Sequence, residues 1–235
     1  MQFVPDGTIG VLFSKWDTRV KDFETYVAET HEEPGKPVYS LGKEPGADGL
    51  YSTDHGDTWR RPGFAQTLND PVIGVSWSEA NAFCAWLSKK EGRTYRLPTD
   101  DEWNRAVGSA KYPWGKSWPP KAVDGNFASE EAKDGNWPDD YRLVPGLRDG
   151  HGRTSPVGSY HANAWGLYDM GGNVWQWCAD AHGPDGDPSE RLMRGASWSS
   201  YDEATLHSNY RGHGSINYRA TNLGFRCVLV ASGGK

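Results

Sequence analysis

The clearest pattern in the chain is a helical repeat of apolar residues in SWSEANAFCAWLSKKEG, residues 76–92. Its apolar side chains recur at the i, i+3, i+4, i+7 spacing of one helix face: Ala80, Phe83, Cys84 and Leu87. Ser76 or Ser78 can cap the start of the helix, and Gly92 can end it. We therefore predict a helix with one buried face over this segment.

Two further segments carry helical signals. In LPTDDEWNRAVG, Thr99 and Glu102 have the spacing of a capping box, and an apolar stripe follows: Trp103, Ala106 and Val107. A weaker pattern over residues 20–30 predicts a helix with three inward side chains: Phe23, Tyr26 and Val27. From about Lys111 onward, short apolar runs alternate with Gly, Pro, Asn and Asp, which predicts turns and short strands. The polar region 116–155 is expected to form extended loop.

Composition changes the expected core. The 235 residues include 12 Trp, 11 Tyr and 29 Gly, so aromatic rings fitted between glycine turns replace layers of Leu, Ile and Val. This favours an α+β fold with little regular secondary structure, in which two to three helices pack on short antiparallel strands. Because no linker or charge block divides the chain, we expect a single domain over residues 1–235.

Charge and hydropathy exclude two classes of partner. The net charge is −6 and no segment concentrates Lys or Arg, so we expect no nucleic-acid binding. No window approaches the roughly 20 apolar residues of a membrane span, so we expect no membrane insertion. The opening MQFVPDGTIGVLF lacks the pattern of a signal peptide, and the given chain is expected to be soluble.

Several phrases, in this order, resemble the formylglycine-generating enzyme, or sulfatase-modifying factor, family. They are PVIGVSW, RTYRLPTDDEW, YPWG, SPVGSYHANAWGLYDMGGNVWQWCAD, RLMRGASW and NLGFRC. The resemblance covers essentially the whole chain, because FSKWDTRVKDFETYV is similar to the family's first strand and helix and LGFRCVLV to its closing strand. It implies a variant of the C-type lectin fold, which agrees with the composition. Function has to be argued separately, since one fold hosts unrelated sites.

Catalysts of this family oxidise a peptide cysteine to formylglycine with dioxygen and copper(I), which is held by two cysteine thiolates about five residues apart. The matching segment here begins at GASWSS, where Ser200 stands at the position of the first thiolate, and no cysteine follows in YDEATLHSNYR. A hydroxyl is not the soft ligand that copper(I) requires, so we expect no catalytic residue of this type and no copper. His207 and His213 leave another metal centre open as an alternative. Related sulfoxide synthases take their iron ligands from an additional helical domain, which the given chain does not include.

The resemblance also implies two structural calcium sites. One uses Asn126 and Asp149 with the backbone carbonyls of Phe127 and His151. The other uses Asp169 and Gln176 with the carbonyls of Gly172 and Val174. Gln176 stands where the family has glutamate, which removes one charge and predicts weaker binding. Asp and Asn that merely close turns are the alternative interpretation.

The three cysteines have separate interpretations. Cys84 and Cys227 resemble a pair that is disulfide-bonded in secreted relatives, and in a reducing compartment they would be packed thiols. Cys178 is expected to be a small buried residue, because no group that lowers a thiol pKa is evident beside it. Six tryptophans in the motifs are interpreted as core: Trp77, Trp103, Trp165, Trp175, Trp177 and Trp198.

Residues 199–221 remain as the candidate site. The segment is rich in Tyr, Ser, Asn and His and lies between the RGASW and NLGFR anchors, which is typical of a binding loop on a rigid scaffold. We expect eight of its residues to contact a peptide, protein or small-molecule ligand: Tyr201, Asp202, His207, Asn209, Tyr210, His213, Asn217 and Tyr218. The segment is also similar to the rewritten face of retroelement variable proteins, since only Glu203 among its 23 residues lies outside the set that NNC codons encode.

Three hypotheses therefore stand: a non-catalytic binding domain, a metal-dependent oxidase that modifies a peptide cysteine, and a module of a larger protein, which is compatible with either.

Overall fold

The computed structural model describes residues 2–3, 11–41, 52–54, 56–133, 137, 140–183 and 186–231. All three predicted helices are confirmed: α1 (Val20–Thr30), α2 (Trp77–Glu91) and α3 (Asp100–Val107). A short 3-10 turn, Glu130–Ala132, lies in the region expected to be loop. Residues 4–10 of the opening segment lie outside the described residues.

Local side-chain chemistry sets the ends of the helices. Ser76, rather than Ser78, caps α2, because its Oγ accepts from Glu79 N at 3.3 Å while Glu79 Oε2 accepts from Ser76 N at 2.8 Å. Thr99 and Glu102 form the same reciprocal pair at the start of α3. Gly92 ends α2 with a φ of 63°, in the left-handed region that glycine adopts without strain.

The strands of the described residues form three sheets. The first sheet has the order β1 (Gln2–Phe3), β2 (Val11–Phe13), β10 (Val228–Val230) and β5 (Tyr95–Arg96). A two-stranded sheet joins β3 (Tyr39–Leu41) to β4 (Ser52–Asp54). The third sheet has the order β8 (Gly212–Ser215), β7 (Asp187–Arg194), β6 (Trp175–His182) and β9 (Leu223–Gly224).

The α+β class is confirmed, with two differences in detail. The hairpin strands β6 and β7 have 8 residues each, longer than the short strands expected from the sequence. In addition, β6 pairs with β9 in parallel, through Trp175 with Leu223 and Gln176 with Gly224. Parallel pairing joins segments that are far apart in the chain, so no local turn pattern predicts it.

The main core is a cluster of aromatic rings under the helices. Phe23 of α1 has its ring 5.1 to 6.4 Å from those of Trp59, Phe83 and Phe225. Trp103, Trp177 and Trp198 are completely buried, as expected for core residues, whereas the other three motif tryptophans are partly buried: Trp77, Trp165 and Trp175. The aromatic core predicted from composition is therefore present.

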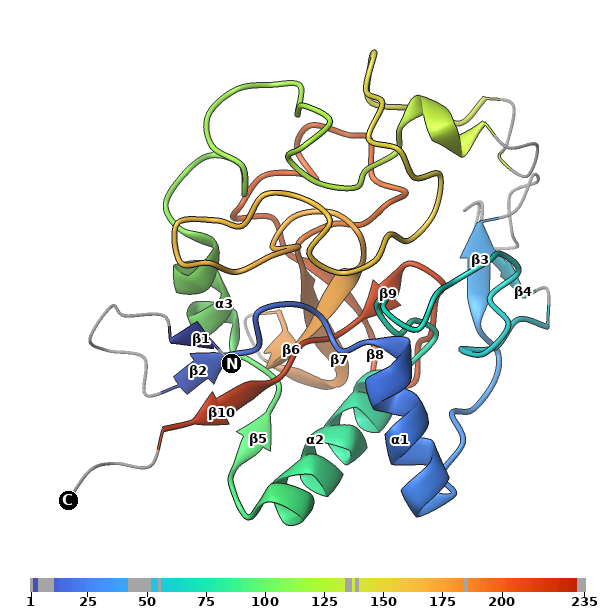
Figure 1. Cartoon of the computed structure of the whole chain (residues 1–235), viewed down its shortest axis with the longest axis vertical. Coiled ribbons are helices and arrows are strands. Elements are labelled where there is room, and N and C mark those ends of the chain that lie inside the picture. Colours follow the sequence, from blue (N-terminus) through green and yellow to red (C-terminus); the bar gives the residue numbers. More distant parts are fainter. Residues whose placement is uncertain are drawn as a thin grey trace.

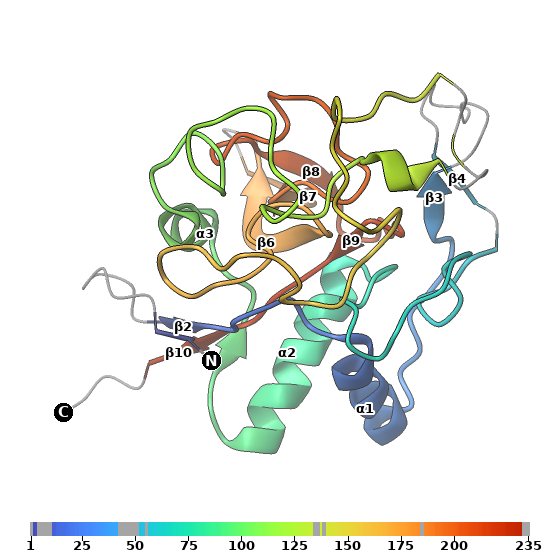
Figure 2. The ribbon, with the colours of Figure 1, turned by 45° about the horizontal axis from the view of Figure 1, so that its top comes forward.

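The molecule has a helical end and a loop-built end (Figures 1 and 2). Helices α1 and α2 lie at the bottom of Figure 1, and loops from residues 111–133, 140–170 and 195–211 gather at the top, with the β6–β7 hairpin between. Among the described residues, no helix combines the length and the apolar character that a membrane span requires.

Candidate functional site

A tight turn leads into the candidate segment. Gly195 and Ala196 both have positive φ, 93° and 61°, so the chain reverses sharply just after β7. Trp198 then anchors the turn, because its backbone N donates to Asn173 O at 2.9 Å and its Nε1 donates to Thr221 O at 3.2 Å. The segment therefore starts from, and returns to, fixed points in the core.

Ser200 lies in a compact cluster of hydroxyl groups. Its Oγ accepts from Ser197 N at 3.1 Å and lies 3.4 Å from Ser197 Oγ. Ser199 Oγ lies 3.1 Å from Ser197 Oγ and accepts from Asn222 Nδ2 at 3.0 Å. Ser200 is only 8 % exposed. The position expected for the first thiolate is thus filled by a hard oxygen ligand that already serves the turn.

The three cysteines lie elsewhere. Cys84 and Cys227 belong to the aromatic core with their sulfurs 3.4 Å apart, and both are free thiols. The neighbouring Cys227 thiol and burial raise the pKa of Cys84. Cys178 is fully buried, and burial raises its thiol pKa as well, so it is a packed, unreactive side chain. The disulfide between Cys84 and Cys227 stays a prediction, with the two sulfurs already side by side.

Three tyrosines of the candidate segment each pack against an aromatic ring outside it. Tyr201 lies 5.2 Å from Tyr141, Tyr210 lies 5.9 Å from Trp175, and Tyr218 stacks on Tyr39 at 5.6 Å, measured between ring centroids. Tyr210 is 39 % exposed, one of few large apolar side chains at the surface. One side of each tyrosine ring is therefore packed against the scaffold, while part of each side chain stays exposed to solvent.

The other predicted ligand contacts occupy separate neighbourhoods. Asp202 Oδ1 accepts from the backbone N of Ala204 and closes its own turn, and Asn209 and Asn217 are exposed. The His207 ring lies 5.3 Å from that of Tyr112. The His213 ring stacks on that of His182 at 3.8 Å, and its Nδ1 lies 3.2 Å from Glu190 Oε2. The eight residues thus extend along a surface rather than converge on one pocket.

His207 and His213 do not share a set of metal ligands. His207 is near Glu203 and Tyr112, whereas His213 is near His182 and Glu190. Within the described residues, no group of three or more His, Cys, Asp or Glu side chains could hold one metal ion. These contacts give no support to a replacement metal centre.

Ion pairs anchor the candidate segment to the scaffold. Arg194 is fully buried, pairs with Asp100 and donates from Nη2 to Ser208 O at 2.8 Å. Arg211 reaches the other oxygen of Asp100, with its Nη2 2.7 Å away. At the far end of the segment, Arg219 pairs with Glu79 of α2. These three arginines are therefore engaged in structural ion pairs.

The first calcium site fits in part. Asn126 Oδ1 is buried and accepts no hydrogen bond, so it is an oxygen that a cation could satisfy. Asp149 is already used: it accepts from Phe127 N at 2.8 Å, His151 N at 3.1 Å and Ser129 Oγ at 2.9 Å. Burial raises the pKa of Asp149. This site stays a prediction, and Asn126 Oδ1 is its main support.

At the second calcium site, the expected side-chain ligand Gln176 is already used. Gln176 Oε1 accepts from Trp103 Nε1 at 2.9 Å and from Arg226 Nε at 2.7 Å, so both of its lone pairs are used. The positively charged guanidinium group of Arg226 therefore lies directly beside it. Gln176 Nε2 donates to Asp169 O at 2.7 Å. Gly172 and Val174, whose carbonyls were expected to coordinate, lie buried on either side of Asn173. This site also stays a prediction, and the hydrogen bonds of Gln176 weigh against it.

Two buried carboxyls adjoin this network. Asp17 is fully buried, and Arg226 Nη2 lies 3.1 Å from its Oδ1 without forming a well-aligned hydrogen bond. Burial raises the pKa of Asp17 to about 8, more than the neighbouring guanidinium lowers it. Burial likewise raises the pKa of Asp169 to about 6. Sequence patterns gave no signal for Asp17, because nothing local to it predicts burial.

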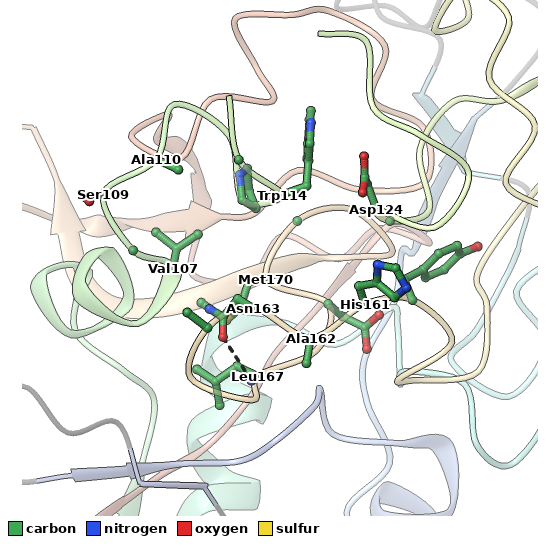
Figure 3. Close-up of a pocket in the computed structure, with 18 residues that line it drawn as sticks. Val107, Ser109, Ala110, Trp114, Asp124, His161, Ala162, Asn163, Leu167 and Met170 are labelled. Carbon is green, nitrogen blue, oxygen red and sulfur yellow. Dashed lines mark hydrogen bonds between the residues drawn. The ribbon is translucent and has the colours of Figure 1, made fainter. Parts of the chain in front are cut away.

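A cavity of about 450 Å³ lies beside the candidate segment (Figure 3). It is bounded by the end of α3, the turn 108–115, residues 124–125 and the loop 160–171. Trp114, Asp124 and His161 line it, and none was singled out from the sequence as a site residue. Three separate chain segments make the cavity, residues 107–115, 124–125 and 160–171, so no single motif could have indicated it.

Comparisons with known proteins show the family of this chain. Residues 12–231 match the family model described as sulfatase-modifying factor enzyme 1-like domain. The chain is 35 % identical over 189 residues to the mouse (Mus musculus) protein named inactive C-alpha-formylglycine-generating enzyme 2, covering 74 % of this chain and 55 % of that protein. It is 32 % identical over 198 residues to the formylglycine-generating enzyme of Streptomyces coelicolor, covering 74 % and 58 %. The chain thus spans somewhat more than half the length of these curated relatives.

Two solved structures share the fold at low sequence identity. PvdO from Pseudomonas aeruginosa superposes with a TM-score of 0.68 at 22 % identity, covering 97 % of this chain and 90 % of that one. Treponema denticola variable protein 1 superposes with a TM-score of 0.63 at 19 % identity, covering 94 % and 84 %. The predicted family is confirmed: this chain belongs to the sulfatase-modifying factor, or formylglycine-generating enzyme, family.

Proposed function

We propose that this chain is a non-catalytic binding domain that presents the surface of residues 199–221 to a peptide, protein or small-molecule ligand. The observation that carries the proposal is Ser200, which serves the hydroxyl cluster of the turn where the family's chemistry needs a thiolate. A 35 % identical relative whose name begins with "inactive" supports the same interpretation.

The aromatic groups of the surface suit binding. Tyr201, Tyr210 and Tyr218 offer large contact area with few rotatable bonds, and a ring behind each limits its movement. Ordering such side chains costs little on binding, because they are already held. We infer that Tyr210, the most exposed of the three, is the central contact of the ligand.

The ion pairs below the surface support a preformed site. Arg194 and Arg211 both reach Asp100, so the backbone around Ser208 is held to the start of α3. A binding loop tied down in this way keeps its shape without ligand, which favours affinity through preorganisation.

The alternative function is oxidation of a peptide cysteine by a metal centre of another kind. To separate it from binding, the purified protein is incubated with a cysteine-containing sulfatase-type peptide, copper(I), a thiol reductant and oxygen, and the peptide is analysed by mass spectrometry. We expect no aldehyde product and no tight copper(I) binding. Conversion of the peptide by folded protein would overturn the proposal.

A peptide display library tests the surface directly. Peptides selected on the wild-type protein are measured against Tyr210→Ala and against Leu68→Ala, which removes a 54 % exposed side chain outside the surface. We expect Tyr210→Ala to weaken binding by about 2 kcal/mol, the size of an interface hot spot, and Leu68→Ala to have no effect. Equal affinities for the two variants would place the binding surface elsewhere.

We also propose that a calcium ion bound at Asn126 stabilises the scaffold. Calcium, but not magnesium, is expected to raise the melting temperature of the wild-type protein, and Asn126→Ala is expected to lose that increase. Asp101→Ala, on the exposed side of α3, is the matched control and should keep it. A wild-type melting temperature that is the same in calcium and in chelator contradicts this part of the proposal.

A further inference from the structure

We propose that the cavity beside the binding surface is a second, independent site that takes an alkylammonium group: a protonated amine carried on an apolar chain. The turn 111–115 separates the two sites. Its Lys111 O accepts from Ser208 N at 2.8 Å and its Tyr112 ring contacts His207, whereas Pro113, Trp114 and Gly115 line the cavity on the other side. The cavity is therefore lined by residues outside the binding surface, and a ligand in it does not depend on the function proposed for residues 199–221.

The carboxyl groups that line the cavity are not balanced by Lys or Arg side chains. None of the 18 residues that line it is Lys or Arg, whereas two are aspartates, Asp124 and Asp169. Asp169 is only 6 % exposed, and its Oδ2 accepts from Gly158 N at 2.8 Å. Asp124 Oδ2 accepts from Lys121 N at 2.7 Å. Within the described part of the chain, the second oxygen of each carboxyl receives no hydrogen bond, so each can accept one from a ligand.

Two other polar side chains of the cavity are already committed to the structure. Asn163 donates to Ala106 O at 2.7 Å and accepts from the backbone N of Trp165 and Leu167. Tyr160 donates its hydroxyl to Asp149 O at 3.2 Å. Asp124 and Asp169, together with the exposed imidazole of His161, are therefore the ionisable side chains left to meet a ligand.

A metal ion is not the cation that these groups fit. Asp124, His161 and Asp169 all line the cavity, but no group of three such side chains among the described residues lies close enough to hold one ion. Charges spread over a cavity of about 450 Å³ suit a larger, organic cation instead, because the volume lies in the range of small-molecule sites.

The remaining lining residues are mainly apolar and suit an apolar chain on the ligand. Val107, Leu167 and Met170 are buried apolar side chains, and Trp114 adds an aromatic ring. In Figure 3, Val107 and Ala110 lie at one end of the cavity, Met170 lies near its middle, and Asp124 and His161 lie at the other end. A ligand with an ammonium group at one end and an apolar chain at the other matches both ends.

The ammonium group could belong to a free amine or to a lysine side chain of a peptide, because both present the same chemistry. Hexylamine is the probe for the first source, with hexanol as its neutral match. Nα-acetyl-lysine amide is the probe for the second, with Nα-acetyl-norleucine amide as its match. Binding is followed by isothermal titration calorimetry and by the indole N–H resonance of Trp114.

The key variant is Asp124→Asn. It keeps an oxygen that can accept from Lys121 N, so the turn is retained while the charge is lost. Asp101→Asn makes the same change outside the cavity and is the matched control. We expect at least one amine to bind about ten times more tightly than its neutral match, and Asp124→Asn to weaken that binding about fivefold with Asp101→Asn unchanged.

Each result decides the proposal. Tighter binding of hexylamine alone assigns the site to free amines, and tighter binding of the lysine derivative alone assigns it to a lysine side chain. Equal binding of the charged and neutral probes overturns the proposal, as does equal binding by wild type and Asp124→Asn. Amine binding that leaves the Trp114 resonance unmoved also overturns it, because the ligand then lies outside this cavity.

Discussion

The family resemblance assigns cysteines to two places in this molecule, and the residues found at the two places differ. In the core, Cys84 and Cys227 are present within the aromatic cluster, with their sulfurs 3.4 Å apart. At the loop-built end, Ser200 and its neighbours fill the turn with hydroxyl groups that bond to one another. The core place therefore holds thiols, and the loop place holds hydroxyl groups. The scaffold and the surface can therefore be perturbed separately.

The largest expected effect tests whether stability resides at the helical end. Phe23→Ala removes a ring that packs against Tyr26, Trp59, Phe83 and Phe225, and should lower the free energy of unfolding by about 3–5 kcal/mol. Urea denaturation followed by circular dichroism measures it. A loss below about 1 kcal/mol would mean that the aromatic core is not the main support of the fold.

The next largest effect concerns the thiol pair. A mild oxidant is expected to form a disulfide between Cys84 and Cys227, which removes two titratable thiols and lowers the mass by two hydrogens. The disulfide should stabilise the fold by about 2–4 kcal/mol, because it would close a loop of over 100 residues. The raised pKa of Cys84 predicts that the reaction is slow at neutral pH. Cys84→Ala should show none of this stabilisation. Consumption of Cys178 by the oxidant would contradict the assignment of the pair.

A smaller effect comes from the buried carboxyls at the boundary of the two regions. Asp17 and Asp169 have folded-state pKa values of about 8 and about 6, above the ordinary value of 3.8. Between 3.8 and its raised pKa, each carboxyl binds more protons in the folded state than in the unfolded state. The contribution of these two groups to stability must therefore fall as pH rises from about 4 to about 8. Urea denaturation at pH 5 and pH 8 measures the slope, which Asp17→Asn should flatten. An unchanged slope in that variant would show that Asp17 does not titrate in this window.

The smallest expected effect is at the surface. Tyr210→Ala should change the free energy of unfolding by less than about 0.5 kcal/mol, because the side chain is 39 % exposed and contacts Trp175 from outside. Thermal denaturation beside Phe23→Ala gives the contrast. A loss comparable to that of Phe23→Ala would remove the distinction between scaffold and surface on which the proposed function depends.

Much of the fold could be predicted because its signals are local. The Thr99–Glu102 capping box marks the start of α3 within four residues, and the apolar spacing from Ala80 to Leu87 defines the buried face of α2, although Leu87 itself is only partly buried. The parallel pairing of β6 with β9 escaped prediction, because the two strands lie about 50 residues apart and no turn connects them directly.

The candidate site was only partly predictable for the same reason. Residue type alone indicates that Ser200 cannot hold copper(I). The use of Gln176 Oε1 by Trp103 and Arg226 depends on groups 73 and 50 residues away, and it removes an oxygen that the family pattern assigned to calcium. Trp114, Asp124 and His161 line one cavity only because separate loops meet there.

The sequence by itself determined the family, the three helices, the aromatic core and the absence of a thiol from residues 199–221, because each depends on residue identity or on neighbours within a few positions. Only the tertiary structure decided which polar groups are already satisfied, which carboxyls are buried and where a cavity remains. These properties depend on contacts between distant segments, and hydrogen bonding and desolvation act through space rather than along the chain.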